Sequence, residues 1–441
     1  MSHRIDGRAL DQLRPVRITP HFTDAPMGSV LIECGNTRVI CTASVEEGVP
    51  PFRKSKGGWL TAEYAMLPGA TGKRKPREYG KRDGRSVEIS RLIGRSLRAA
   101  CDLGRLGENT VTIDCDVLQA DGGTRCASIT GGFVAMTLAC HRMLAEGRIP
   151  DSFITRQVAA VSCGLVGDEE RLDLCYEEDS RAQVDMNVVL SRKNGGGMEY
   201  VECQASAEGR SMSREELNGL MDLGEKGNGE LMEAQLTALG DAASVIGKKP
   251  RLVLASGNFG KLREMRALLG DRFDVVSQKE MGAEPDEETG ETFAENAVIK
   301  AESILRKTGC ASIADDSGLA VDALGGRPGV HSARYCGVHG DDEANNQLLL
   351  RELKDVPAPR TARYVCAMAL ARPGRPTLVA EGTCEGQIIF DRRGEGGFGY
   401  DPYFLSDDLG VTFAEAEPEK KNGVSHRARA IAALLTKLDG E

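Results

Sequence analysis

The chain has 441 residues, of which 41% are hydrophobic and 28% are charged, and its formal net charge is −10. This length is too great for one ordinary hydrophobic core and fits two or three domains. The negative charge argues against a broadly basic nucleic-acid-binding protein, so any RNA contact must come from a local basic patch. No apolar run approaches the roughly 18 residues of a membrane span, and the first residues lack the apolar core of a signal peptide. We therefore expect a cytosolic protein with no membrane partner.

A domain boundary is predicted near Pro250. Residues 213–239 carry two groups of apolar side chains at helical spacing, with Gly224, Gly227 and Gly229 between the groups, a pattern typical of a terminal helix pair. Small and charged residues follow, and residues 251–258 then form a short apolar strand that opens a loop, as α/β domains often begin. We therefore expect an α/β chain with domains at residues 1–240 and 250–441, joined by a linker at residues 241–249.

The first half is predicted to begin with two short strands at residues 30–44, joined by a hairpin turn at residues 35–36.

A basic loop and a basic helix follow in the first half. Residues 73–85 hold seven basic side chains against two acidic ones, and glycine and proline keep this segment out of regular structure. A solvated run of charge is the usual meaning of such a cluster. Here, however, residues 86–101 have the spacing of a helix with Arg91, Arg95 and Arg98 along one face, so the basic surface continues on an ordered element. We interpret it as a surface for a polyanion.

A candidate anion site follows the predicted strand at residues 111–118. The turn at residues 119–125 is rich in glycine and leads into a predicted helix at residues 128–144. The unpaired backbone N–H groups and the dipole of a helix N-terminus attract anions, and phosphate is the natural occupant. Thr124 adds a hydroxyl, and Arg125 adds a fork of donors that matches phosphate oxygens. An ordinary β-turn has the same Asp-Gly-Gly sequence, so the turn alone does not distinguish the two readings.

Two carboxylates flank the next predicted turn. Residues 172–179 and 183–190 are predicted as paired strands joined at residues 180–182, and Asp185 lies on the polar face of an otherwise buried strand. A structural hydrogen-bond acceptor would explain this carboxylate. The alternative is that Asp179 and Asp185 hold a divalent cation or move a proton beside a phosphate.

Residues 1 to about 240 closely resemble ribonuclease PH. The matching blocks are 6–8, 62–68, 84–85, 91–95, 114–125 and 185–189. The resemblance implies a ribosomal-protein S5 type, domain-2-like fold that assembles into a hexameric ring, and a phosphorolytic 3′-to-5′ exoribonuclease that trims tRNA precursors and other structured RNA 3′ ends. It implies that Asp179 and Asp185 are the catalytic pair that binds Mg²⁺, and that inorganic phosphate, the co-substrate, is bound by Arg85, Gly123, Thr124 and Arg125. Gly69 stands where many members have arginine, which removes one RNA contact.

The second half repeats the order of strand, glycine loop and helix. Residues 256–261 follow a predicted strand at 252–255 and end at Lys261, without the spacing of a P-loop, but such a loop can still contact a triphosphate. Further on, Asp315 and Asp316 end a short apolar strand, where α/β sheets place ligands. Repulsion makes that pair costly without a cation. The commoner role of Asp-Asp-Ser is to cap a following helix.

Two more segments complete the pattern of the second half. Residues 396–402 put aromatic side chains in a flexible glycine frame suited to stacking on a base, and residues 420–427 supply hydrogen-bond donors before the last helix. With residues 256–261, 315–318 and 325–329, they resemble the inosine/xanthosine triphosphate pyrophosphatase family over essentially all of residues 250–441. The resemblance implies an elongated α/β fold, a dimer, Mg²⁺ dependence, and hydrolysis of purine nucleoside triphosphates such as ITP, dITP and XTP to monophosphate and pyrophosphate.

The same resemblance implies a role for each motif residue. Asp316 is the catalytic general base and a metal ligand, Glu287 is a second metal ligand, and Ser317 contacts the substrate. The phosphates are bound by Ser256, Gly257, Asn258, Phe259, Gly260 and Lys261. The nucleoside is held by Phe398, Gly399, Tyr400 and Asp401, and the base is read by Lys421, His426 and Arg427. By contrast, Asn296 and Lys300 share one face of a predicted helix, a pairing that is most often surface decoration.

Two alternatives stay open. The first half can be an RNA-binding scaffold that has lost phosphorolysis, with catalysis only in the second half; Gly69 supports this reading, and the intact block at residues 121–125 opposes it. The second half can be a broader nucleotide pyrophosphatase, for instance of the Maf type, although His426 and Arg427 beside Ser425 argue against this. The sequence favours a natural fusion of a tRNA-trimming exoribonuclease with a pyrophosphatase that cleanses the nucleotide pool.

Overall fold

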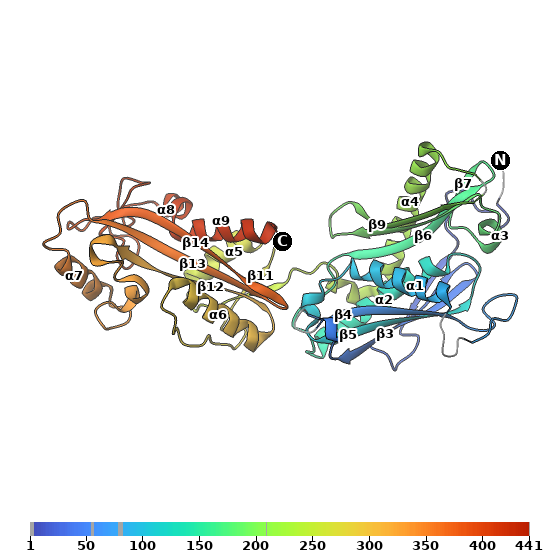
Figure 1. Ribbon diagram of the computed structural model, residues 1–441, viewed down its shortest axis with the longest axis horizontal. Helices are drawn as coiled ribbons and strands as arrows, with labels where there is room; N and C mark the ends of the chain where they lie inside the picture. The colour runs from blue at the N-terminus through green and yellow to red at the C-terminus, as the bar shows by residue number, and fades with distance from the viewer. Residues whose placement is uncertain (1–3, 54–56, 78–82, 209, 441) are drawn as a thin grey trace. The chain divides into compact units, whose positions relative to one another are not determined.

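The computed structural model describes residues 4–53, 57–77, 83–208 and 210–440. The chain forms two compact units, residues 1–248 and 249–441. Both units combine sheets with helices, so the predicted α/β class with two domains is confirmed (Figure 1). None of the helices in the described ranges is long and apolar enough to cross a membrane. The cytosolic location stays a prediction.

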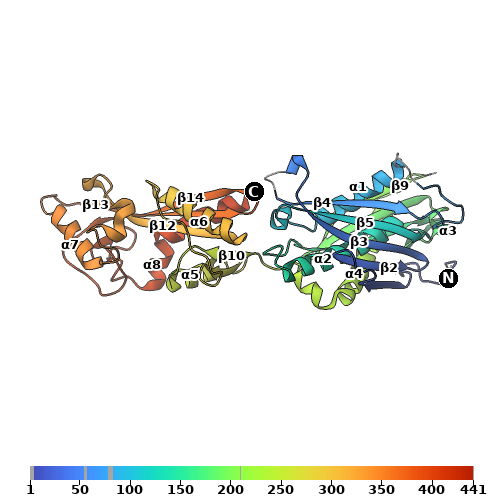
Figure 2. The ribbon, with the colours of Figure 1, turned by 90° about the horizontal axis from the view of Figure 1, so that it is seen from below.

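The first unit contains two sheets with helices between them (Figure 1). The five-stranded sheet has the order β1-β2-β3-β5-β4, and its strands are β1 Val16–Pro20, β2 Gly28–Cys34, β3 Thr37–Glu47, β4 Trp59–Met66 and β5 Asn109–Gln119. Four of these, β2, β3, β5 and β4, run side by side in Figure 2. The four-stranded antiparallel sheet has the order β7-β6-β8-β9, with β6 Gln157–Val166, β7 Glu169–Leu172, β8 Val184–Arg192 and β9 Met198–Ala207.

The helices of the first unit are α1 Gly84–Arg98, α2 Thr124–Ala145, α3 Tyr176–Asp179 and α4 Arg214–Leu239, with short 3-10 turns η1 Pro51–Arg53, η2 Leu103–Leu106 and η3 Gly240–Val245. Helix α2 contacts β2 and β3 of one sheet and β6 of the other, which explains why most of its side chains are buried. Its small residues allow this close packing: a Cβ added at Gly131 would lie 2.7 Å from a methyl carbon of Ile32. Strands β4 and β5 are parallel, and the segment that connects them contains helix α1, as is usual for a crossover between parallel strands.

Three predictions for the first unit need correction. The predicted helix pair over residues 213–239 is the single helix α4, because Gly224 and Gly227 serve close packing instead of ending a helix; a Cβ on Gly224 would lie 2.8 Å from Val188. The predicted strand at residues 172–179 is wrong, since only Leu172 ends a strand and residues 176–179 form α3. Helix α2 begins at Thr124, four residues before the predicted start. The hairpin turn at residues 35–36 and the strands at 111–118 and 183–190 are confirmed.

The second unit is one six-stranded sheet with helices on both faces (Figure 1). Its order is β11-β10-β12-β13-β14-β15, with β10 Arg251–Leu254, β11 Asp274–Ser277, β12 Ala311–Val321, β13 Thr361–Arg372, β14 Arg375–Ile388 and β15 Phe404–Ser406. The helices are α5 Phe259–Leu269, α6 Phe293–Thr308, α7 Asp342–Glu352, α8 Pro418–Val424 and α9 His426–Asp439, and 3-10 turns are η4 Asp322–Leu324 and η5 Gly329–Arg334. Helices α5 and α9 share one apolar core with the sheet, and α6 packs in another.

The segment between the units is shorter than the predicted linker of residues 241–249. Turn η3 and the residues after it pack on the first unit, where Ala242, Val245 and Ile246 are buried in its core. The backbone N–H of Gly247 also donates to the carbonyl of Ile154 at 2.9 Å. The small residues of this segment therefore belong to the first unit, although their composition resembles that of a linker.

We expect cleavage after Lys248 to leave two separately active proteins, whereas cleavage after Gly240 should destabilise the first unit. The second cut detaches η3 and its buried apolar side chains, and each fully buried large apolar side chain contributes about 1.5 to 3 kcal/mol. Protease sites inserted at the two positions, followed by thermal unfolding of the first unit and assays of both activities, make the comparison. Loss of either activity after the cut at Lys248 would show that the units depend on each other.

Two candidate active sites

The first candidate site lies at the N-terminus of α2. Gly123 precedes this helix with φ at 66°, a left-handed conformation that favours glycine, and no side chain caps the helix start. The first N–H groups of α2 therefore face the site without a capping oxygen, which suits an anion. The Thr124 hydroxyl lies 2.9 Å from the Tyr64 hydroxyl, on the neighbouring strand β4. These positions agree with the anion site predicted from the turn at residues 119–125.

Two arginines contribute positive charge to this site. Arg125 lies in the first turn of α2 and Arg85 in the first turn of α1, and both act electrostatically on Asp179 and Asp185. Arg125 donates to the side-chain oxygen of Gln204 at 2.9 Å, so its guanidinium is held from the side of β9. The structure thus brings together arginines that the sequence separates by 40 positions.

The acidic pair comes from two different elements. Asp179 is the last residue of the single turn α3, not the end of a strand as predicted, and Asp185 lies in β8. Burial raises the pKa of both carboxyls, and repulsion from Asp179 adds to the shift of Asp185, whose pKa rises to about 6. Neither carboxylate has an ion pair within 4 Å among the described residues. Two half-buried, unpaired carboxylates beside a phosphate position fit a Mg²⁺ ion, which prefers oxygen ligands and one or two carboxylates.

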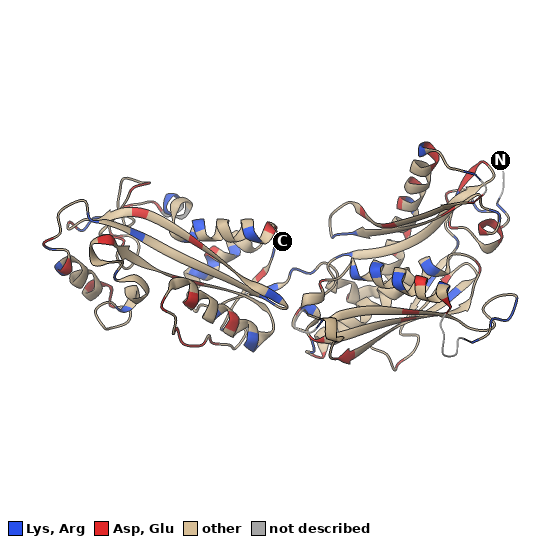
Figure 3. Ribbon diagram, in the orientation of Figure 1, with Lys and Arg blue, Asp and Glu red and all other residues tan. Residues whose placement is uncertain are grey.

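A basic surface continues from this site along α1, as predicted (Figure 3). Two of its arginines already have partners: Arg95 pairs with Glu202 at 2.7 Å, and the Arg98 guanidinium lies 4.8 Å from the centre of the Trp59 ring. Residues 78–82 of the predicted basic loop lie outside the described residues, and residues 73–77 are exposed. Gly69 is exposed as well, with open space where a side chain would stand.

The second candidate site is organised by Asp315 and Asp316, which point to opposite faces of the sheet. They lie inside the long strand β12 instead of ending a short strand, so alternation separates the two carboxylates. Because the carboxylates of Asp315 and Asp316 lie on opposite faces, they repel each other less than the sequence suggests, and no cation between them is needed. Gly318 also lies in this strand, at a position that requires glycine because an added Cβ would lie 2.5 Å from the Gly329 carbonyl.

Asp316 faces helix α6. Its Oδ2 accepts a hydrogen bond from the Asn296 amide at 3.1 Å, and its Oδ1 lies 3.6 Å from the Lys300 ammonium. Asn296 and Lys300 are both buried, so the reading of this pair as surface decoration was wrong. Burial raises the pKa of the Asp316 carboxyl, which Lys300 only partly offsets. The raised pKa makes Asp316 a stronger base than an exposed aspartate.

The second acidic residue near Asp316 is Glu288, not the predicted Glu287. Both glutamates are exposed, but Glu288 accepts a hydrogen bond from the Lys300 ammonium at 2.8 Å and adds to the raised pKa of Asp316. Glu287 has no hydrogen bond or ion pair with any of the described residues. Sequence reasoning could not choose between two adjacent glutamates in an irregular loop, because nothing local fixes which of them turns toward α6. Oxygen donors from Asp316 and Glu288 fit a Mg²⁺ ion.

Asp315 faces helices α5 and α9 and is paired with two cations. Both of its oxygens accept from the Lys261 ammonium at 2.8 Å, and Oδ2 lies 3.2 Å from the Arg427 guanidinium, which also pairs with Glu264. Burial opposes ionisation of Asp315, yet Lys261 and Arg427 hold its pKa well below the usual range. The structure thus places Lys261 and Arg427, two predicted substrate contacts, around the buried carboxylate of Asp315, to which sequence reasoning assigned no role separate from that of Asp316.

A side chain of the loop before α5 caps the N-terminus of this helix. The Asn258 side chain accepts from the backbone N–H groups of Gly260 and Lys261, at 2.8 and 3.2 Å, and so fills the start of the helix. Phe259 beside it is 80% exposed. Phosphate contact by the backbone of this helix start therefore requires Asn258 to give up its cap, while Ser256 and Gly257 remain at the surface of the loop.

The aromatic loop at residues 398–401 divides into exposed and buried parts. Phe398 is 70% exposed, whereas Tyr400 and Asp401 are buried. Tyr400 donates to the Ser332 carbonyl at 2.8 Å, and Asp401 pairs with Lys421 at 2.6 Å. Phe398 is thus free to stack on a base, and the other two side chains hold the loop that carries it. Ser317, on the strand next to Asp316, is half-buried.

Residues 425–427 have three different contacts at the start of α9. Ser425 caps the helix by accepting from the backbone N–H of Ala428 at 3.2 Å, and Arg427 pairs with Asp315. The His426 ring stacks on Tyr364 with centroids 5.0 Å apart, and its Nδ1 is buried without a hydrogen-bond partner among the described residues. Burial, helped by the nearby Arg427, lowers the pKa of His426 to about 3. His426 is therefore neutral at physiological pH.

This burial predicts an acid-sensitive second unit. The pKa of an unfolded histidine is near 6.5, so between pH 6.5 and 3 the unfolded state binds the proton and the folded state does not. Stability should be unaffected above pH 7 and fall by about 2 kcal/mol from pH 7 to pH 5. His426→Phe keeps the stacked ring and cannot titrate, so calorimetry of both full-length proteins at the two pH values should show a smaller loss in the variant. Equal losses would assign the acid sensitivity to another group.

Comparison with known proteins covers both units. The 3′ exoribonuclease family matches with its domain 1 over residues 12–140 and its domain 2 over residues 156–227, and the Ham1 family matches over residues 252–437. Ribonuclease PH of Corynebacterium kroppenstedtii is 59% identical over 239 residues, which are 54% of this chain and 92% of that protein. Ribonuclease PH of Corynebacterium glutamicum is 59% identical over 240 residues, 54% and 96% of the two chains.

Among solved structures, a nucleoside-triphosphatase / dITP/XTP pyrophosphatase from Mycobacterium abscessus is 47% identical and covers 42% of this chain and 98% of its own, with a TM-score of 0.38. The relatives that match the first unit are ribonucleases PH, so the inactive-scaffold alternative is not favoured. The predicted fusion is thereby confirmed. The chain belongs to the 3′ exoribonuclease family, as a ribonuclease PH, through its first unit and to the Ham1 family of nucleoside triphosphate pyrophosphatases through its second.

Proposed function

We propose that the first unit removes nucleotides one at a time from the 3′ ends of RNA, tRNA precursors included, by transferring them to inorganic phosphate. The observation that carries this proposal is the joint approach of Arg85, Arg125 and the uncapped start of α2 to the Asp179–Asp185 pair. Inorganic phosphate would bind at Gly123, Thr124 and Arg125. The reaction must hold two mutually repelling phosphates together, and a site of this charge pattern meets that need.

In this reaction an oxygen of inorganic phosphate attacks the phosphorus of the last phosphodiester. The bond from phosphorus to the 3′ oxygen of the preceding ribose breaks, a nucleoside diphosphate leaves, and the shortened RNA takes up a proton at its new 3′ hydroxyl. Arg85 and Arg125 neutralise the charge that accumulates on the phosphate oxygens. Asp179 and Asp185 would hold Mg²⁺, which supplies further neutralisation when bound. The protein needs no covalent nucleophile.

We propose that the second unit hydrolyses ITP, dITP and XTP to the monophosphate and pyrophosphate. The observation that carries this proposal is Asp316, a half-buried carboxylate with a raised pKa, held between Asn296 and Lys300. Asp316 would take the proton of the attacking water, and Lys300 would restrict the carboxylate to one orientation. Asp316 and Glu288 would hold Mg²⁺, which neutralises the phosphate chain when bound.

The remaining residues of the second site would recognise the nucleotide. Lys261 and the loop at residues 256–260 would face the phosphates, and Phe398 would stack on the base. A neutral His426 fits recognition of an uncharged purine.

We further propose that the first unit assembles into rings and the second into dimers.

Product analysis of the full chain tests both proposals. With phosphate and Mg²⁺, an RNA ending in a single-stranded 3′ tail should yield nucleoside diphosphates, and omission of phosphate should stop the shortening. ITP should yield IMP and pyrophosphate, with a kcat/KM at least about tenfold above that for ATP, since one unpaired buried hydrogen-bonding group costs about 1 to 3 kcal/mol. Nucleoside monophosphates from RNA, or IDP from ITP, would contradict the respective proposal.

A further inference from the structure

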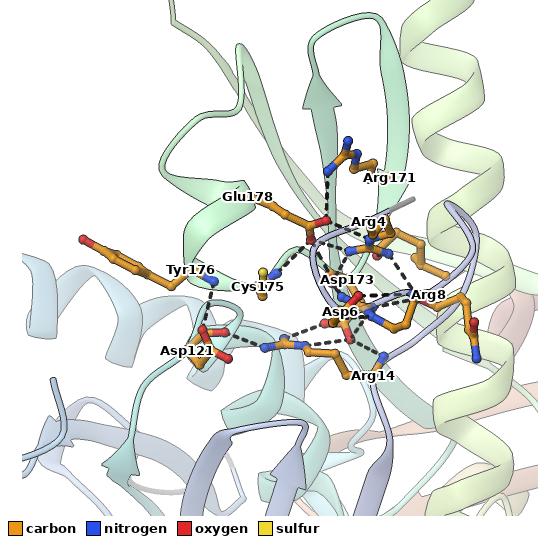
Figure 4. Close-up of polar contacts among 12 residues, drawn as sticks. Arg4, Asp6, Arg8, Arg14, Asp121, Arg171, Asp173, Cys175, Tyr176 and Glu178 are labelled. Atoms are coloured by element: carbon orange, nitrogen blue, oxygen red, sulfur yellow. Dashed lines mark hydrogen bonds and ion pairs between the residues drawn. The ribbon is translucent and has the colours of Figure 1, made fainter. Parts of the chain in front are cut away.

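A buried cluster of arginines and carboxylates lies beside the phosphate turn of the first unit (Figure 4). We name it the arginine–carboxylate cluster; its members are Arg4, Asp6, Arg8, Arg14, Arg171, Asp173 and Glu178. Its side chains come from the N-terminal segment and from residues 171–178, segments that lie more than 150 positions apart in the sequence. No member belongs to the proposed catalytic or phosphate-binding residues.

One half of the cluster fixes the phosphate turn. Arg14 donates through Nε and Nη2 to the two oxygens of Asp173, at 3.0 and 2.6 Å, and through Nη1 to the backbone carbonyl of Asp121 at 2.5 Å. A Cβ added at Gly123 would lie 3.1 Å from Arg14, so the guanidinium packs directly against the turn. Arg14 therefore sets the position of the backbone that starts α2.

The other half of the cluster fixes α3. A helix of four residues is not stable alone, because a single turn gains too few hydrogen bonds to offset its ordering. Glu178 holds this turn: it accepts from the Arg4 Nε at 2.8 Å, from Arg171 at 3.0 Å and from the backbone N–H of Cys175 at 3.2 Å. The next residue is Asp179, so the contacts of the buried Glu178 carboxylate also fix the position of the Asp179 carboxylate in the site.

The two halves meet through the backbone. Arg4 also donates to the carbonyl of Asp173 at 3.0 Å, and Asp173 has φ at 54°, a left-handed conformation that is unfavourable for a residue with a side chain. The Asp121 carboxylate accepts from the backbone N–H of Tyr176, the first residue of α3, at 3.2 Å. A Cβ added at Gly122 would lie 2.5 Å from the Leu174 carbonyl, which shows how tightly the turn packs against the segment before α3.

We propose that Arg14–Asp173 and Arg4–Glu178 are positioning pairs, which set the separation between the phosphate turn and the Asp179 carboxylate and thereby control how tightly inorganic phosphate binds. The inference rests on the phosphorolysis proposed above. A purely stabilising role explains the cluster less well, because buried ion pairs contribute little net stability compared with apolar groups of the same size. The cluster instead supplies what apolar side chains cannot, directional contacts to Asp121 on one side and to α3 on the other.

The test uses the full chain with Arg14→Lys and Glu178→Gln. Lysine keeps the charge but cannot reach Asp173 and Asp121 together, and glutamine keeps the shape but loses the charge that holds Arg4 and Arg171. The KM for inorganic phosphate should rise by about ten- to a hundredfold in each variant, as for groups that orient a site from behind. Hydrolysis of ITP by the second unit of the same chain should be unchanged and measures the amount of intact protein.

The matched control is Gln235→Met, which removes a buried polar contact on α4 that touches neither α3 nor the phosphate turn. It should lower the thermal midpoint without changing the KM for phosphate. A wild-type KM in both folded variants would overturn the inference, and so would failure of the first unit to fold in both, because the pairs would then act on stability alone. Absence of phosphorolysis in the wild-type protein would instead refute the proposed function.

Discussion

Replacing Asp185 by Asn should reduce phosphate-dependent shortening of RNA at least about a thousandfold and leave hydrolysis of ITP unchanged. Asp185 lies half-buried in β8, where Asp179 repels its charge and no ion-pair partner among the described residues lies within 4 Å of its carboxylate. Removing one charge from this pair removes the balance between cation and phosphate that the reaction requires, a contribution of about 4 kcal/mol at the upper range of single electrostatic groups. The loss of activity is measured as the release of nucleoside diphosphates with and without added phosphate.

A measurement of thermal stability distinguishes loss of catalysis in the Asp185→Asn variant from unfolding. Burial raises the pKa of the Asp185 carboxyl to about 6, so its charge is unfavourable in the folded state at neutral pH, and the Asn variant should unfold at the same or a higher temperature. Asp116 provides a control, since partial desolvation also raises the pKa of this aspartate, but its side chain is exposed and lies in β5. Asp116→Asn should retain phosphorolysis. Normal activity of Asp185→Asn would refute the assignment of this residue to the cation site.

Local signals were sufficient to predict the parts of the fold that depend on short-range order. The hairpin at residues 30–44 could be predicted because strand alternation and a Gly-Asn turn coincide there. A helix start after the glycine turn could be predicted from the sequence, although α2 begins at Thr124 and not at residue 128. Glycine led to a wrong prediction where its role is close packing. Gly224 and Gly227 were predicted to interrupt a helix, but both lie inside α4, where Val188 and Leu172 leave no room for a larger side chain.

Contacts between distant segments could not be predicted. Asp179 was expected at the end of a strand, but Glu178 holds this segment as a helical turn through Arg171 and through Arg4, which is far away in sequence. In the second unit, Asp315 and Asp316 read as one acidic site, and only the continuation of β12 between β10 and β13 shows that they serve different faces. The buried positions of Asn296 and Lys300 depend on the packing of α6 against that strand, which the spacing of the helix alone does not reveal.

This separation of two neighbouring carboxylates leads to the second large effect. Asp316→Asn should reduce kcat for ITP at least about a thousandfold, because asparagine cannot accept the proton of the attacking water. Its stability should not fall, since burial already disfavours the charge that is removed. Asp315→Asn should behave in the opposite way: it leaves the half-buried Lys261 and Arg427 without their shared carboxylate and should cost up to about 3 kcal/mol of stability.

The two variants therefore form a matched pair that differs by one position in the chain. Thermal unfolding of the full-length proteins and kcat for ITP in the fraction that stays folded should show a loss of chemistry for Asp316→Asn and a loss of stability for Asp315→Asn. A folded Asp316→Asn protein that turns over ITP at the normal rate would remove this residue from the reaction. The opposite outcome at the neighbouring position, a stable but inactive Asp315→Asn, would mean that the carboxylate acts on the substrate through Lys261 and Arg427 and does not chiefly hold α5 and α9 against the sheet.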